Sequence, residues 1–273
     1  MSVKPKASKD KKHKKSFEKK RSPKTRVVMV GCGGMARHHI RQMLAQHKTT
    51  EITLLCEPSP EAYLATQTLF EQEGLAVPDN ISDLNHLLAT RRAELDAAFI
   101  ITPHSHHFEQ AKACLQAGLD VLLEKPMVLN QHEAKELIRV RDETGRLLVV
   151  AFNGSLSPNL RKAASMLRAG ELGNILNISA TVWQNWRDLT NDTWRQEPEI
   201  AGGGFLFDTG AHMLNSVADL AGEDFSEVAA WLDNKGRKVD ILGAVMGRLA
   251  SGALVTMNAC GDAIPPTCTS EIQ

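Results

Sequence analysis

Paired cysteines, long apolar runs and net charge are all missing from this chain of 273 residues. Its five cysteines include no C-x-x-C pair, which argues against a disulfide framework and indicates free thiols in a reducing compartment, the cytoplasm. No apolar run approaches the roughly 20 residues needed to cross a bilayer. The sequence therefore predicts a protein without a membrane segment.

The balance of 32 Lys and Arg against 32 Asp and Glu conceals an asymmetry along the chain. Residues 1–26 hold twelve bases and two acids, a net of +10, so the remainder carries −10. This segment has almost no apolar residues to bury, and we expect a disordered basic tail. It has no apolar core of a secretory signal. A basic arm can bind nucleic acid, but a solvated extension is the preferred interpretation.

The stretch from Val27 to Ala36 organises the rest of the chain. Four apolar residues predict a buried parallel strand, and Gly31, Gly33 and Ala36 then match the three small positions of the fingerprint G-x-G-x-x-G/A. An amphipathic helix is expected next, at 35–46, so the pyrophosphate of a dinucleotide would meet a helix N-terminus. The expected cofactor-binding residues of this turn are Gly31, Cys32, Gly33, Gly34, Met35 and Ala36.

Glu57 ends a second predicted strand at 51–56 and lies about 20 residues beyond the glycine turn. A dinucleotide site needs a carboxylate there to accept hydrogen bonds from the ribose hydroxyls. The same carboxylate repels a 2′-phosphate, and no Lys or Arg comes immediately after it. We therefore expect NAD(H) to be preferred over NADP(H). The alternative is an ordinary acid in a solvated loop.

Strands and helices alternate regularly up to residue 151, which predicts an α/β fold with a doubly wound parallel sheet. Further strands are expected at 95–101, 121–123 and 147–151, with helices between them. His104, His106 and His107 come after one of these strands, but no cysteine or carboxylate accompanies them at ligand spacing, so no metal site is expected.

Beyond a helix at 159–169 the pattern changes to longer strands, which predicts an antiparallel sheet in an α+β domain. The expected strands are 177–182, 227–231, 239–248 and 253–259. A triple glycine at 202–204 indicates a close approach of the backbone to another group. Asp208 and His212 come after it at i and i+4, so on a helix they share one face.

Several separated motifs occur in an order that resembles the glucose–fructose oxidoreductase and inositol dehydrogenase (Gfo/Idh/MocA) family. They are the glycine turn, Thr102-Pro103 with His107, Glu124-Lys125-Pro126, Trp194-Arg195, and the segment from Gly202 to His212. The resemblance implies a Rossmann domain at 27–151 and an α+β substrate and oligomerisation domain at 152–273. It also implies hydride transfer between NAD(P) and a hydroxyl or keto carbon of a sugar, cyclitol or related polyol.

The resemblance further implies roles for individual residues. The catalytic set would be Lys125, Asp208 and His212, with His212 suited to accept a proton and Lys125 to stabilise charge on the substrate oxygen. The other cofactor-binding positions would be Thr102, Pro103, His107, Glu124 and Lys125. Substrate contacts would come from Lys125, Asn153, Trp183, Arg195, Asp208 and His212.

Two departures from the family pattern change these expectations. Asn153-Gly154-Ser155 stands where many relatives place an Arg or His that reaches the substrate. The chain also ends at Gln273, where relatives continue, so the second domain is expected to be incomplete, with Leu242, Val245 and Val255 exposed at its edge. A homo-oligomer through the second sheet is expected for a full-length chain. A non-catalytic, dinucleotide-sensing regulator on the same fold remains the alternative function.

Overall fold

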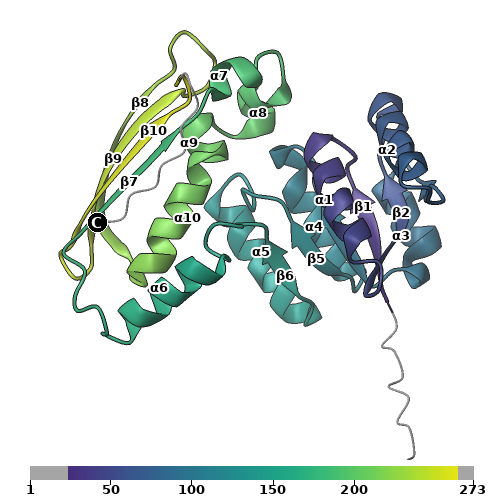
Figure 1. Ribbon diagram of the computed structural model, residues 1–273, viewed down its shortest axis with the longest axis horizontal. Coiled ribbons are helices and arrows are strands. Elements are labelled where there is room, and N and C mark those ends of the chain that lie inside the picture. Colours follow the sequence, from purple (N-terminus) through teal and green to yellow (C-terminus); the bar gives the residue numbers. More distant parts are fainter. Residues whose placement is uncertain (1–23, 264–273) are drawn as a thin grey trace, which may run out of the picture.

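The computed structural model describes residues 24–263, so most of the basic tail and the last ten residues of the expected second domain lie outside the described residues. Figure 1 shows two domains side by side, each built on its own sheet. No helix in the described part of the chain is long and apolar enough to cross a membrane. The cysteines in that part are all free thiols.

The first domain contains the predicted doubly wound sheet. Its strands are β1 (Thr25–Val30), β2 (Thr50–Cys56), β3 (Asp79–Asn80), β4 (Ala97–Ile100), β5 (Asp120–Leu123) and β6 (Leu148–Val150). They pair in the order β3-β2-β1-β4-β5-β6, and every pairing is parallel. The order reverses between β1 and β4, which is where open α/β sheets bind their ligands.

Helices cover both faces of this sheet. They are α1 (Gly34–Ala45), α2 (Pro60–Gln72), α3 (Leu84–Arg91), α4 (His107–Gln116) and α5 (Gln131–Thr144), with 3₁₀ turns η1 (Arg92–Glu94) and η2 (His104–His106). Val27 and Met29 pack with α1 and α2, while Val28 and Val30 pack into the core beneath α3, α4 and α5. Burial on both faces explains why β1 shows no alternation of apolar and polar residues.

The second domain carries a mixed sheet rather than the antiparallel one expected from the sequence. Its strands are β7 (Asn177–Trp183), β8 (Phe225–Asp233), β9 (Leu242–Leu249) and β10 (Leu254–Cys260), in the order β7-β10-β9-β8. β8, β9 and β10 form an antiparallel meander, but β7 pairs parallel with β10. Two parallel neighbours need a long connection that returns the chain to the same end of the sheet. The helical segment between β7 and β8 is part of such a connection.

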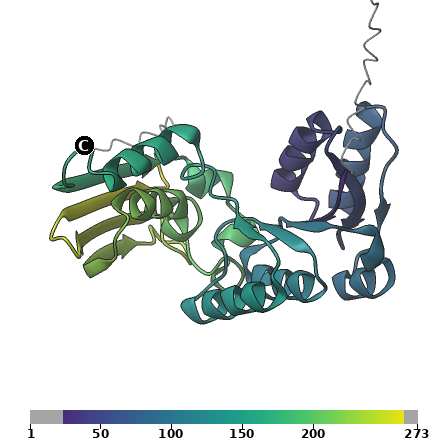
Figure 2. The same ribbon diagram turned by 90° about the horizontal axis from the view of Figure 1, so that it is seen from below.

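Helices occupy one face of the second sheet (Figure 2). The helices of this domain are α6 (Pro158–Arg168), α7 (Trp186–Leu189), α8 (Pro198–Ala201), α9 (Phe205–Asp208) and α10 (Gly210–Ala221), with the 3₁₀ turn η3 (Trp194–Gln196). α9 and α10 contact the sheet directly, and α6 packs against α10. Val245 and Val255 are 6% and 1% exposed and Leu242 packs against the same core, so the expectation that they are exposed was wrong. Trp231, Met246 and Leu254 are exposed on the opposite face.

Candidate active site

A cavity of about 510 Å³ opens at the carboxyl ends of the parallel strands, and η3 of the second domain contributes Trp194 and Arg195 to its wall. Most of the residues predicted to bind the cofactor line it. They are Gly31, Gly33, Gly34, Met35, Ala36, Glu57, Thr102, Pro103, Glu124 and Lys125. Residues far apart in the sequence therefore meet around one space of the size that ligand sites have.

The glycine turn fits a bound pyrophosphate. Gly31 has a φ of +90°, and a Cβ placed on it would lie 2.3 Å from the carbonyl oxygen of Ile101. Added Cβ atoms at Gly33 and Gly34 would meet no described atom within 4 Å, so the backbone there is open to the cavity. Among the described residues no side chain caps the N-terminus of α1, which leaves its N–H groups available to an anion.

Glu57 is held in place at the end of β2. Its two carboxylate oxygens accept from the backbone N–H of Cys32 at 2.6 Å and of Ser59 at 2.7 Å. The side chain is almost fully buried, yet it lines the cavity. A carboxylate fixed in this way can accept hydrogen bonds from ribose hydroxyls without first being ordered by them.

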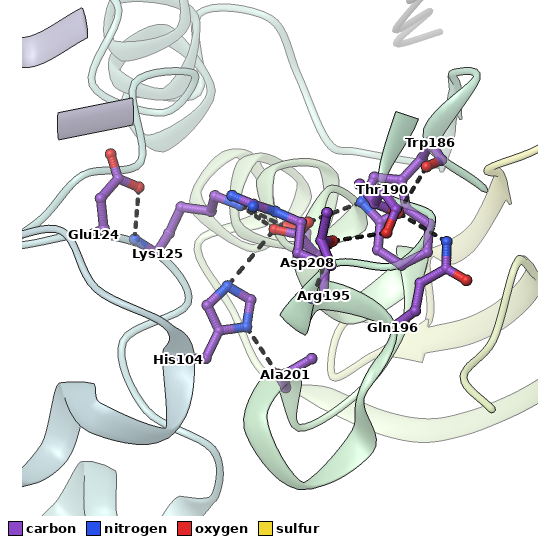
Figure 3. Close-up of polar contacts among 10 residues, drawn as sticks. His104, Glu124, Lys125, Trp186, Thr190, Arg195, Gln196, Ala201 and Asp208 are labelled. Carbon is purple, nitrogen blue, oxygen red and sulfur yellow. Dashed lines mark hydrogen bonds and ion pairs between the residues drawn. The ribbon is translucent and has the colours of Figure 1, made fainter. Parts of the chain in front are cut away.

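Lys125 and Asp208 join the two domains at the cavity (Figure 3). Lys125 comes after β5, and its Nζ lies 2.5 Å from Asp208 Oδ1 and 3.1 Å from the Asp208 carbonyl oxygen. Asp208 ends α9, and both side chains are largely buried. The structure thus brings together two residues of the expected catalytic set that are 83 positions apart.

Asp208 has further partners within the second domain. Trp186 Nε1 donates to Oδ2 at 2.9 Å, and Arg195 Nε forms an ion pair with Oδ2 at 3.2 Å. Burial of Asp208 acts to raise the pKa of its carboxyl, but Lys125, Arg195 and the Trp186 hydrogen bond outweigh it and lower the pKa to about 2. Asp208 is therefore an anion at neutral pH. The guanidinium of Arg195 also stacks on the Trp194 ring at 4.4 Å.

The triple glycine explains how α9 reaches this position. A Cβ on Gly204 would lie 2.0 Å from the carbonyl oxygen of Asp240, and one on Gly203 would lie 2.6 Å from Phe207 Cβ. The Asp240 carboxylate accepts from the backbone N–H groups of Gly204 and Leu206. The close approach predicted from the glycines is made to the chain's own Asp240 loop, and it sets the start of α9.

His104 belongs to this site, although from the sequence it was considered only as a metal ligand, a role that was not expected for it. It is 3% exposed and lines the cavity. Its Nδ1 donates to the carbonyl oxygen of Ala201 at 2.8 Å, which leaves Nε2 facing Asp208 Oδ1 at 3.7 Å. Burial lowers the pKa of His104 to about 4, so the ring is neutral at neutral pH. Its place after β4, at the ligand-binding edge of the sheet, could be predicted from the sequence, but its contacts with Ala201 and Asp208 could not.

Two predicted cofactor residues lie behind the cavity wall. The Cys32 side chain is fully buried, and only its backbone N–H faces Glu57. His107 is also fully buried, with Nδ1 2.8 Å from the Pro126 carbonyl oxygen and Nε2 3.0 Å from that of Thr102. Both residues support the wall from behind and do not line the cavity.

The remaining predicted residues also lie outside the cavity lining. His212, on α10, is partly buried, and its Nδ1 finds no hydrogen-bond partner among residues 24–263. Burial and the charge of Lys125 lower its pKa, so its imidazole is neutral at neutral pH. Asn153 is exposed after β6, and Trp183 lies at the end of β7, where it lines the same depression in the second sheet as Trp231. Neither of these two therefore lines the cavity.

These features define an NAD-binding, two-domain protein with an ion pair of Lys and Asp at the cavity. Residues 25–152 match the family model of the oxidoreductase family with an NAD-binding Rossmann fold, and residues 160–272 match that of the GFO/IDH/MocA C-terminal domain. The chain belongs to the Gfo/Idh/MocA family of oxidoreductases.

Several curated proteins are similar in sequence. The levoglucosan dehydrogenase of Pseudarthrobacter phenanthrenivorans is 32% identical over 54% of this chain and 40% of its own. The scyllo-inositol 2-dehydrogenase (NADP(+)) of Bacillus subtilis is 31% identical over 49% and 37%. A putative UDP-kanosamine synthase oxidoreductase subunit of Amycolatopsis mediterranei is 30% identical over 76% and 58%. The matches span less than two thirds of these relatives' lengths.

A solved structure of levoglucosan dehydrogenase in complex with NADH and levoglucosan has the same fold. It is 26% identical, with a TM-score of 0.79 over 91% of this chain and 70% of that one. The WlbA dehydrogenase from Bordetella pertussis, at 24% identity and a TM-score of 0.81, supports the fold alone.

Proposed function

We propose that the protein is an NAD(P)-dependent oxidoreductase that transfers hydride between the nicotinamide and a hydroxyl or keto carbon of a sugar, cyclitol or related polyol. The observation that carries the proposal is the Lys125–Asp208 ion pair at the cavity that the glycine turn and Glu57 also line. It places a cation and an anion beside a dinucleotide site.

The glycine turn and the N-terminus of α1 would hold the pyrophosphate, and Glu57 would hold the adenosine ribose. The nicotinamide, when bound, supplies the acceptor or donor of the hydride. Pro103, Glu124 and Lys125 form the stretch of lining between this end and the second domain. The residues present therefore fit the cofactor.

Oxidation of a hydroxyl also releases a proton and develops negative charge on the oxygen. The ammonium of Lys125 would stabilise that charge, while Asp208 holds the ammonium in position from the opposite side. His212 would accept the proton, because its imidazole is neutral and lies near enough to Lys125 for the charge of that lysine to lower its pKa. Arg195 would contact further hydroxyls of the substrate.

The relatives support this class of substrate. A protein 26% identical to this chain is solved with NADH and levoglucosan, and other relatives are named dehydrogenases of inositol and xylose. A regulator that only senses the dinucleotide would have no use for a Lys–Asp pair at the cavity, and no specific observation favours that alternative.

The test is a panel of sugars, cyclitols and polyols with NAD or NADP, with turnover measured by the absorbance of the reduced nicotinamide. We expect turnover of at least one member of the panel, in the oxidative direction or, with keto sugars, in the reverse direction. Tight binding of NADH by calorimetry without turnover of any panel member in either direction would favour the regulator.

A further inference from the structure

Glu124 is held from two sides at the cavity. One carboxylate oxygen, Oε1, lies 2.8 Å from Nε2 of His39, and the other, Oε2, accepts from the backbone N–H of Lys125 at 3.0 Å. The Glu124 side chain is 13% exposed and the His39 side chain 25%. The largely buried carboxylate of Glu124 therefore connects His39 of α1 with the backbone of Lys125, although His39 and Lys125 lie far apart in the sequence.

The protonation state of this contact is set by its surroundings. Burial acts to raise the pKa of Glu124, but the hydrogen bonds from His39 and from the Lys125 backbone outweigh it, and the pKa is lowered. Glu124 is therefore an anion and can only accept hydrogen bonds. His39 Nε2 must then carry the proton and donate it to Glu124.

His39 connects the helix beside the glycine turn, through Glu124, to Lys125. His39 lies on α1, the helix that begins at Gly34 beside the glycine turn. Lys125 is fixed at both of its ends, by Glu124 at its backbone N–H and by Asp208 at Nζ. If His39 is removed, the buried carboxylate loses one of its two donors and can change rotamer, and the backbone of Lys125 loses its support.

We propose that His39 is a positioning residue, which orients Glu124 and through it the catalytic Lys125 relative to the cofactor-binding helix. The role in turnover rests on the proposed function, but the placement of Lys125 does not. A displacement of about 1 Å at a reacting group can lower turnover by about 100-fold, so a residue that touches neither substrate nor cofactor can still control the rate.

The kinetic test compares His39→Ala with His39→Gln, because the amide nitrogen of Gln can donate from a position similar to Nε2. His38→Ala is the matched control, since this neighbouring histidine is exposed on the same helix. We expect kcat to fall by about 10- to 100-fold in His39→Ala, to recover largely in His39→Gln and to stay unchanged in His38→Ala. The Kd for NADH should change little in all three.

A second readout needs neither substrate nor cofactor. Peptide mass spectrometry of the folded protein measures the rate at which an amine reagent such as trinitrobenzenesulfonate modifies Lys125. The ion pair with Asp208 should keep this rate low in the wild type, and His39→Ala should raise it several-fold while His38→Ala does not. This measurement decides the placement of Lys125 even if the panel of substrates yields no turnover.

The proposal is overturned if Lys125 is modified at the same rate in His39→Ala as in the wild type. It is also overturned if kcat, NADH affinity and unfolding free energy all fall together without recovery in His39→Gln. That result would make the contact an ordinary support of the fold.

Discussion

At Glu57 two backbone N–H groups fix a carboxylate that faces the cavity, and this arrangement predicts the cofactor preference. A fixed anion accepts from ribose hydroxyls and repels a 2′-phosphate. We expect the wild type to bind NADH more tightly than NADPH, and Glu57→Arg to shift the ratio of the two Kd values toward NADPH. Titration calorimetry measures both.

The matched control for this charge change is Glu71→Arg, which alters an exposed acid near the end of α2. It should leave the ratio of Kd values unchanged. Equal or tighter binding of NADPH by the wild type would contradict the assignment, and the NADP-dependent inositol dehydrogenase among the relatives makes this comparison informative.

His104 predicts how stability depends on pH. Its folded pKa of about 4 lies below the ordinary value of 6.5, so between these values the unfolded state binds more protons than the folded state. Its contribution therefore lowers the free energy of unfolding as the pH falls from 6.5 to 4. Asp208, with a pKa of about 2, stays ionised through most of this window and contributes little to the loss.

Replacing His104 by Asn isolates this effect. The Asn amide can still donate to the carbonyl oxygen of Ala201 but does not titrate. Urea unfolding at several pH values should show a smaller acid loss in His104→Asn than in the wild type. Identical slopes in both proteins would mean that His104 is protonated equally in its folded and unfolded states.

At the scale of single elements, Gly204 sets the start of α9 and thereby the position of Asp208. An added Cβ would lie 2.0 Å from a backbone oxygen of Asp240, and a backbone atom cannot move aside as a side chain can. We expect Gly204→Ala to lower the unfolding free energy by about 1–3 kcal/mol, the usual cost of forcing atoms into a packed site. Activity should fall with it.

Gly243→Ala is the control, because the atoms nearest to an added Cβ there in β9 belong to leucine side chains, the nearest at 3.3 Å. It should cost much less stability than Gly204→Ala. Equal unfolding free energies for the two variants in urea titrations would show that the backbone at Asp240 moves aside to accept the added Cβ, and that a glycine is not required at position 204.

Most helices and strands could be predicted, because a buried element shows a characteristic pattern of apolar residues in consecutive sequence positions. The apolar run of β1 and the spacing of α1 both appear in consecutive residues. The two-residue strand β3 was missed, and so were the one-turn helices α7 to α9, because such short segments carry no period. The parallel pairing of β7 with β10 was also missed, since it depends on how the intervening helices pack.

The site was predictable only where a motif fixed it. Lys125 and Asp208 each stand in a recognisable motif, and the structure brings them together. His39 was missed, and His104 was considered only as a metal ligand, because their partners, Glu124 and the Ala201 carbonyl, are 85 and 97 positions away. Trp183 was placed in the substrate pocket because it lies near the triple glycine in the sequence, but strand alternation turns its side chain to the open face of the sheet.

At the scale of the whole molecule, no element among residues 24–263 covers one face of the second sheet. Trp231, Met246 and Leu254 are 67%, 54% and 48% exposed there. An apolar face of this kind is typical of an interface, and we propose that it forms a homo-oligomer. Light scattering should find a dimer or larger species, and Trp231→Lys should dissociate it.

Leu64→Lys is the control for this prediction, because Leu64 is an equally exposed apolar residue on α2 of the first domain, at 63%. It should leave the molar mass unchanged. A wild type that is monomeric at micromolar concentration, or an oligomer that survives Trp231→Lys, would place the interface elsewhere.

The chemical step depends, in the proposed function, on the Lys125–Asp208 pair, and kcat of Lys125→Ala is the decisive measurement. Asp208 keeps Trp186 and Arg195 as partners in this variant, so the site should remain folded. At saturating cofactor we expect kcat to fall by roughly 10²–10⁴-fold with NADH affinity nearly unchanged, while Lys135→Ala, an exposed lysine of α5, has no effect. Near-normal turnover by a folded Lys125→Ala protein would contradict the proposed role of the pair.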